Sequence, residues 1–220
     1  MKIKVLYEDN HIIAVYKESG ILTQGDNSRK PSLLSETKKY LKKKYNKTGN
    51  VFLGLVHRLD MPVSGIVLFA KTTKAASRLS QEFRNHKVEK VYHAVVIGKP
   101  EKKSGVLISY IEKDKDRNKV KVFNTLKPKS KRAELYYEII KSNNKYSLLK
   151  IWIKTGKPHQ IRAQLSFLGC PILGDVKYGA YNPLDDKSIM LCANEISFKL
   201  TTQDKIKKIS VPLPRAFKLT

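Results

Sequence analysis

Apolar residues recur along the chain with two different periods, and these periods predict its helices and strands. A spacing of three or four predicts helices over residues 31–45 and 73–84, and Pro158 and Gly169 delimit a short helix over residues 160–168. Short β-branched and aromatic runs with partial alternation predict strands over residues 5–9, 12–16, 90–97, 119–123, 134–140, 147–153 and 206–211. The pattern therefore mixes both types of element.

The segments between these elements are short or polar. Residues 98–118 and 124–132 are rich in Lys, Gly, Ser, Asp and Pro, which predicts exposed loops, and Asn143-Asn144 predicts a turn. We find no internal repeat, long linker or low-complexity segment. The fold class expected is α+β, one domain over residues 1–220 with a mostly antiparallel sheet.

The net charge of the chain indicates which class of molecule it binds. Lys and Arg number 44 against 19 Asp and Glu, which gives a net charge of +25 that is spread along the whole sequence. Such a surface attracts polyanions by releasing their counterions, so it favours a nucleic acid as partner. A proteome that is generally rich in lysine is the alternative explanation.

Other features of the composition exclude classes of protein. No apolar run is long enough to span a bilayer, and the first residues lack the apolar region of a signal peptide, so we expect a cytoplasmic protein. Cys170 and Cys192 fit no metal motif and are expected to be free thiols. No metal is therefore implied.

Asp60 is a candidate reactive group because acids are scarce around it. It is the only acid in residues 51–81, and it lies in a charged cluster that leads through Pro62 and Gly65 into an apolar strand. On a surface that binds phosphates, an isolated carboxylate weakens binding by repulsion. Asp60 is therefore either the structural partner of a basic group or a reactive group. The residue pattern by itself favours the structural role.

Two further segments offer candidate side chains. Residues 155–162 gather donors where a helix begins, with His159 and Arg162 on one helical face. Either this helix only touches phosphate, or Arg162 points inward and pairs with a carboxylate, which it would keep ionised. Tyr92, on a predicted strand, either belongs to the core or presents its ring to a flipped base.

Together these segments resemble the RluA-type family of RNA pseudouridine synthases. The matching blocks are His57-Arg58-Leu59-Asp60 with Ser64-Gly65, Lys90-Val91-Tyr92-His93-Ala94, Thr155-Gly156 with His159-Gln160-Ile161-Arg162, and Gly174-Asp175 with Tyr178-Gly179. The opening residues 6–9, residues 17–22 and Pro212-Leu213-Pro214 also fit, so the resemblance runs through nearly the whole chain in order.

The resemblance implies a fold and a reaction. The fold would be that of a pseudouridine synthase, a curved, mixed and mostly antiparallel sheet flanked by helices and loops. The chain would isomerise uridines to pseudouridine in ribosomal RNA or tRNA, as a monomer and without cofactor or metal. On this reading it would begin directly at the catalytic domain, without the N-terminal RNA-binding domain of many relatives.

The resemblance also assigns roles to single residues. Asp60 would attack the sugar or the base, or take a sugar proton, and Arg162 would be its salt-bridge partner. Tyr92 would stack on the flipped uracil, Arg58 would brace the space that the base leaves, and Leu165 would line the pocket. His57 and His159 would contact the RNA.

The chain departs from the family pattern at Met61, Val63, Lys157-Pro158, Gln164 and Cys192. Because Asp60, Tyr92 and Arg162 are intact, these departures bear on substrate preference rather than on catalysis. Two other classes of function compete with this one. A non-catalytic RNA-binding protein would not need Asp60, and a hydrolase of nucleosides or RNA ends would release uracil or fragments.

Overall fold

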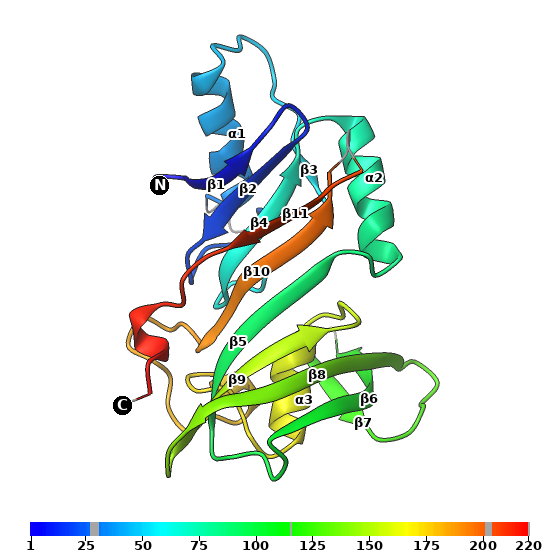
Figure 1. Cartoon of the computed structure of the whole chain (residues 1–220), viewed down its shortest axis with the longest axis vertical. Helices are drawn as coiled ribbons and strands as arrows, with labels where there is room; N and C mark the ends of the chain where they lie inside the picture. The colour runs from blue at the N-terminus through cyan, green and yellow to red at the C-terminus, as the bar shows by residue number, and fades with distance from the viewer. Residues whose placement is uncertain (27–30, 115, 201–203, 220) are drawn as a thin grey trace. The chain divides into compact units, whose positions relative to one another are not determined.

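The computed structural model describes residues 1–26, 31–114, 116–200 and 204–219, and in it the chain forms two compact units. Unit 1 comprises Met1–Glu89 and Ala193–Val211, and unit 2 comprises Lys90–Cys192 and Pro212–Thr220. Each unit combines a sheet with helices (Figure 1), so the α+β class is confirmed. The expectation of a single domain over residues 1–220 stays a prediction.

In the sheet of unit 1, one central strand is buried along its whole length and a neighbouring strand at all but one residue. Its strands are β1 (Lys4–Glu8), β2 (Ile12–Lys17), β3 (Gly54–Leu55), β4 (Ser64–Ala70), β10 (Leu191–Lys199, in this unit from Ala193) and β11 (Ile206–Ser210). They are ordered β1-β2-β4-β10, with β3 beside β4 and β11 beside β10. Every residue of β4 is buried, which explains the continuous apolar run after Gly65.

Two capped helices complete unit 1. Helix α1 (Leu33–Lys44) begins at a capping box in which Ser32 and Ser35 exchange hydrogen bonds. Helix α2 (Thr73–Arg84) begins at Thr72, whose side chain accepts the Ala75 N–H, as the sequence predicts. Buried residues of α2 and of β2 and β4 belong to one core cluster.

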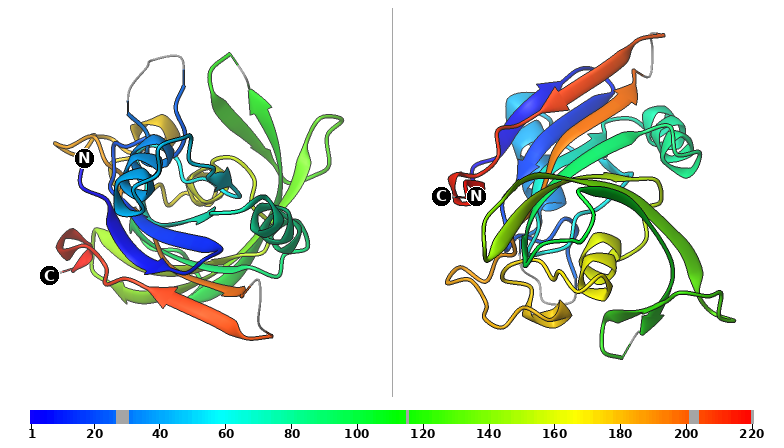
Figure 2. Two further views of the ribbon diagram at one scale, coloured as in Figure 1. Left: turned by 90° about the horizontal axis from the view of Figure 1, so that it is seen from above. Right: turned by 60° about the horizontal axis from the view of Figure 1, so that its bottom comes forward.

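Unit 2 is a five-stranded antiparallel sheet with one helix. Its strands β5 (Glu89–Ile97), β6 (Ser104–Asp114), β7 (Lys119–Phe123), β8 (Lys131–Ser142) and β9 (Tyr146–Ile153) are ordered β5-β9-β8-β6-β7. Helix α3 (Gln160–Phe167) lies beside these strands (Figure 2) and contacts β6 and β7. The turn between β8 and β9 is closed by Asn143, whose Oδ1 accepts the N–H groups of Lys145 and Tyr146.

The predicted loop over residues 98–118 was wrong in its middle, which is strand β6 (its residue 115 lies outside the described part). Strand β6 shows no polar–apolar alternation, because the apolar Val106 and Ile108 are more than half exposed while the polar Ser109 faces the interior. The buried Ser109 hydroxyl is satisfied by Gln164, whose Nε2 lies 3.0 Å away. Residues 131 and 132, expected in the next loop, belong to β8.

Strand β10 was also missed, because Asn194-Glu195 interrupts its apolar run. The short 3-10 turns η1 (Val176–Tyr178) and η2 (Arg215–Phe217) lie where the sequence predicted neither a helix nor a strand. In the described ranges, no helix has both the length and the apolar character that crossing a membrane requires.

Candidate active site

The loop that carries Asp60 is held in place through its own backbone. Residues 59–62 connect β3 to β4, and each of their carbonyls accepts a hydrogen bond from the same unit. The donors are Thr23 Oγ1 to Leu59 (2.8 Å), Val63 N to Asp60 (3.1 Å), Lys17 Nζ and Gly20 N to Met61 (both 2.9 Å), and Ser19 Oγ to Pro62 (2.9 Å). These bonds end on backbone carbonyls, so they brace the loop whatever the side chain at position 60.

Lys17 is the centre of this bracing and was missed as a site residue by sequence reasoning. Its side chain is fully buried, and Nζ donates to the carbonyls of Ile21 (2.7 Å), Met61 (2.9 Å) and Glu18 (3.2 Å). Burial lowers the pKa of Lys17 to about 8, and the Asp60 carboxylate opposes this fall. Asp60 therefore has a cation of its own unit nearby.

The pKa of Lys17 predicts how its contribution to stability depends on pH. Because this pKa is about 8 in the fold and about 10.4 in an unfolded chain, the unfolded state binds more protons between these values. Burial of the charged Lys17 therefore destabilises the fold fully below about pH 8, and this destabilisation decreases as the pH rises toward 10. We expect the free energy of unfolding of the natural protein, minus that of Lys17→Met, to rise with pH over this range, by up to about 1.4 kcal/mol per pH unit.

Urea unfolding of the two proteins at pH 7, 8, 9 and 10 measures this difference. Groups that titrate in both proteins cancel in the subtraction. A difference that stays flat or falls with pH would contradict the assignment of a depressed pKa to Lys17.

His57 and Arg58 precede Asp60 on the same loop but have different surroundings. The His57 Nε2 accepts the backbone N–H of Leu68 (2.9 Å), and its ring stacks on Phe83 with centroids 4.8 Å apart. Nε2 is therefore used within the protein, which makes His57 a brace between the loop, β4 and α2. Arg58 is exposed. The predicted contacts of both residues with RNA stay predictions.

Gly65 is required where the loop enters β4. Its φ is +132°, and a Cβ built there would lie 2.3 Å from the Ala193 carbonyl oxygen. Since that oxygen belongs to backbone, a side chain at this position would force two strands apart. The Ser64-Gly65 pair of the sequence motif thus has a steric reason.

Helix α3 is fixed at both ends. At its start, two residues after Pro158, the Gln160 Oε1 accepts the Lys157 N–H (3.0 Å) and Gln160 Nε2 donates to the Glu134 carbonyl (3.0 Å). At its end, Cys170 N donates to the Leu165 carbonyl and Gly169, with φ +85°, donates to Ser166. This pair of bonds is a Schellman motif, in which glycine supplies the left-handed residue.

Arg162 forms a buried ion pair with Asp175, a residue whose role the sequence reasoning did not identify. Nε lies 2.7 Å from Oδ2 and Nη2 lies 2.8 Å from Oδ1, and the two residues are 5% and 1% exposed. Two parallel charge-assisted bonds fix the plane of the guanidinium. Asp175 therefore sets the orientation of Arg162.

Tyr178 connects this ion pair to His159. The Arg162 guanidinium lies 5.0 Å from the centre of the Tyr178 ring, and the Tyr178 hydroxyl lies 2.7 Å from His159 Nδ1. The same hydroxyl accepts the backbone N–H of Val120 (3.0 Å). His159, with φ +52°, is thus held at the start of α3 by a buried tyrosine that sequence reasoning noted only as part of a motif.

Tyr92 and Leu165 lie in the interior of unit 2. Tyr92 is on β5 opposite Ile151 of β9 and is 7% exposed, and Leu165 on α3 is fully buried. Unit 2 thus carries Tyr92, His159, Arg162 and Leu165, while unit 1 carries His57, Arg58 and Asp60. That both sets act on one nucleotide, and that Asp60 pairs with Arg162, stay predictions.

Neither cysteine is placed in a metal cluster. Cys170 and Cys192 are buried, and within the described residues no three or more His, Cys, Asp or Glu side chains are grouped as metal ligands would be. Burial raises the pKa of the Cys170 thiol, which makes it less reactive.

Known proteins resemble this chain over most of its length. The family model described as RNA pseudouridylate synthase matches residues 11–167. Ribosomal large subunit pseudouridine synthase C of Rickettsia prowazekii is 38% identical over 215 residues, which are 97% of this chain and 69% of that protein. Ribosomal large subunit pseudouridine synthase D of Borreliella burgdorferi is 32% identical over 221 residues, which are 98% of this chain and 66% of that protein.

A solved structure has the same fold. Human RNA pseudouridylate synthase domain containing 4 superposes with a TM-score of 0.80, at 23% identity, over 97% of this chain and 90% of that one. At this identity the likeness concerns the fold alone.

Proposed function

Because this chain belongs to the RNA pseudouridylate synthase family and is thus an RNA pseudouridine synthase, we propose that it modifies specific uridines of ribosomal RNA. The observation that carries this choice is its similarity, over nearly its whole length, to enzymes named for the large ribosomal subunit. Transfer RNA is the alternative substrate. A net charge of +25 suits either polyanion.

The reaction needs few parts. The N1–C1′ bond of the nucleotide breaks, the uracil turns, a C5–C1′ bond forms, and the hydrogen on C5 is replaced by the sugar while N1 gains a proton. The isomerisation is redox-neutral overall and needs no external oxidant or reductant, so we propose that the enzyme uses neither cofactor nor metal. Water must be kept away, because it would capture the detached sugar.

We assign the central step to the Asp60 carboxylate, which attacks the sugar or the base or takes a sugar proton. Support comes from its position on a loop whose carbonyls are all hydrogen-bonded, with the Lys17 ammonium nearby. A carboxylate on a rigid loop does not have to be reoriented during the reaction, which lowers the barrier. Lys17 is a positioning residue in this account.

Arg162 is proposed to pair with Asp60 and to keep it ionised. The bidentate contact with Asp175 supports this role, because it fixes the guanidinium before substrate binds. Tyr92 is proposed to stack on the flipped uracil and to help move a proton, with Leu165 lining the same pocket.

Arg58, His57 and His159 are proposed to contact the RNA around the target. Arg58 is exposed on the Asp60 loop and is suited to occupy the space that the flipped base leaves. His159 is held by Tyr178 and has a ring whose position is fixed. The enzyme is proposed to act as a cytoplasmic monomer.

A pseudouridine map of total RNA tests the proposed substrate. We expect a strain that lacks the gene to lose one or a few pseudouridines of large-subunit ribosomal RNA, and a plasmid copy to restore them. Loss of pseudouridines from tRNA alone would show that tRNA, and not ribosomal RNA, is the substrate. An unchanged map would favour a non-catalytic RNA-binding role.

A further inference from the structure

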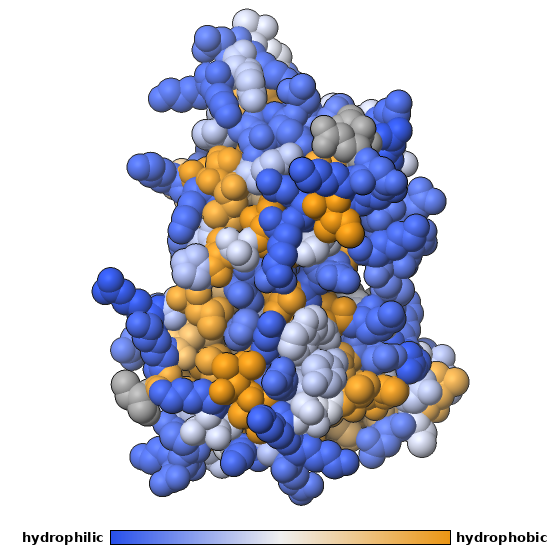
Figure 3. All heavy atoms as spheres, in the orientation of Figure 1, coloured by the Kyte–Doolittle hydropathy of each residue, from blue (hydrophilic) through white to orange (hydrophobic). Residues whose placement is uncertain are grey.

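Helix α1 presents one apolar and one cationic face. Its buried residues Leu33, Thr37 and Leu41 are spaced four apart and define the inner face. Lysines occupy the arc on the opposite side, at positions 38, 39, 42 and 43, and Lys47 follows the helix. The surface over this part of unit 1 is mostly hydrophilic (Figure 3).

Most of these lysines have no acidic partner within the described residues. Of the two acids nearby, Glu36 binds Lys39 (2.7 Å), and Glu8 binds Lys44 and Lys71 (both 2.7 Å). Lys38, Lys42, Lys43 and Lys47 make no ion pair in the described part of the chain. Lys42, Lys43 and Lys47 are exposed and Lys38 is half-buried, so the four charges form one cationic face.

This arrangement costs helix stability. Lys38 and Lys42, and likewise Lys39 and Lys43, are four residues apart, and like charges at this spacing repel each other by a few tenths of a kcal/mol. The helix dipole explains lysines in the last turn, but it accounts neither for Lys38 in the middle of the helix nor for Lys47 beyond its end. A polyanionic ligand would remove the repulsion.

We propose that the lysine face of α1, formed by Lys38, Lys42, Lys43 and Lys47, binds the phosphate backbone of the substrate RNA outside the nucleotide that is modified. The inference rests on the proposed function only in that the polyanion is RNA. The face carries no aromatic or amide group among these four residues, so it reads charge and not sequence.

The test replaces the four lysines together by Gln and measures binding to a uridine-containing RNA hairpin as a function of salt. We expect a dissociation constant raised about tenfold or more near physiological salt, and a slope of log K against log salt that is smaller by up to about 3. In turnover experiments KM should rise while kcat at saturating RNA stays unchanged.

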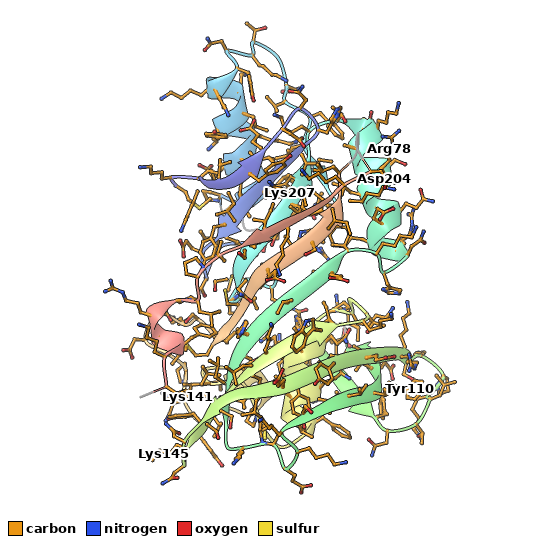
Figure 4. All side chains as sticks on the ribbon, viewed as in Figure 1. Arg78, Tyr110, Lys141, Lys145, Asp204 and Lys207 are labelled. Carbon is orange, nitrogen blue, oxygen red and sulfur yellow. The ribbon has the colours of Figure 1, made fainter. Side chains whose placement is uncertain are left out.

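A matched control separates this face from net charge. Replacing Lys74, Lys87, Lys102 and Lys145 by Gln removes the same charge from exposed positions across both units, with Lys145 at the turn between β8 and β9 (Figure 4). We expect this variant to bind nearly as the natural protein does. An equal loss of affinity in both variants, or no loss in the α1 variant, would overturn the proposal.

A single substitution tests whether misfolding, and not the loss of charge, lowers the affinity for RNA. Lys38→Glu places an acid four residues before Lys42, the favourable orientation for a helical ion pair, so its melting temperature should equal or exceed that of the natural protein. Its affinity for RNA should nevertheless fall. A stable Lys38→Glu variant with unchanged affinity would contradict the proposal. Because binding is measured without turnover, the result stands whether or not ribosomal RNA is the substrate.

Discussion

Replacing Asp60 by Asn will abolish pseudouridine formation and leave RNA binding intact. The amide has the shape of the carboxylate but can neither attack the sugar or base nor take a proton. We expect the single-turnover rate to fall by about 10⁴-fold or more, as for other essential groups of this kind. Structure is expected to survive, because the hydrogen bonds that Lys17, Ser19 and Thr23 donate to carbonyls of residues 59–62 remain in the variant.

The matched control for this variant is Glu18→Gln. Glu18 is an exposed acid beside the same loop, and like Asp60 it raises the pKa of Lys17. The Glu18→Gln variant should therefore reproduce the effect of removing a negative charge near Lys17, and it should keep most of the activity. An Asp60→Asn enzyme that retained a tenth or more of the natural rate would refute the assignment.

Replacing Asp175 by Ala will produce the largest loss of stability. The change removes two charge-assisted hydrogen bonds from a guanidinium that is 5% exposed. Removing one partner of a buried ion pair costs about 3–5 kcal/mol, because the remaining charge stays in a medium of low polarity. The free energy of unfolding from urea titration measures the cost, and activity should fall in parallel.

The double variant Asp175→Leu with Arg162→Leu separates stability from function. Removing both members of a buried pair is often nearly neutral, so much of the lost stability should return. Activity should not return, because the proposed partner of Asp60 is gone. Recovery of activity in the double variant, or a single variant as stable as the natural protein, would contradict our account of Arg162.

Local sequence predicted the helices well because α1 and α2 have a one-sided buried stripe and a side-chain cap, and α3 is followed by a glycine that closes it. Helix α2 begins and ends where its pattern does, and α3 ends at Phe167, two residues before the left-handed Gly169 that closes its Schellman motif. Strand β6 failed because its exposed positions are apolar and its buried Ser109 depends on Gln164, which is 55 residues away. No window of local sequence contains that contact.

Some residues of the candidate site could be predicted from local sequence, and others could not. Asp60, Tyr92 and Arg162 could be chosen from ordered motifs, whereas Lys17, Asp175 and Tyr178 take their roles from contacts between distant segments. Lys17 reaches the Met61 carbonyl across 44 residues, and Tyr178 reaches Val120 across 58. The signals for Lys17 were its position after an apolar strand and the match of residues 17–22 to the family pattern, and neither specifies a partner.

The most direct test of the central claim follows the atoms of the uridine. RNA transcribed with tritium on uracil C5 is incubated with the enzyme, and the water, the free uracil and the RNA length are measured together. Isomerisation predicts tritium in the water in proportion to the pseudouridine formed, with no free uracil and with RNA of unchanged length. Release of uracil or RNA fragments, or tritium that stays on the RNA, would contradict it.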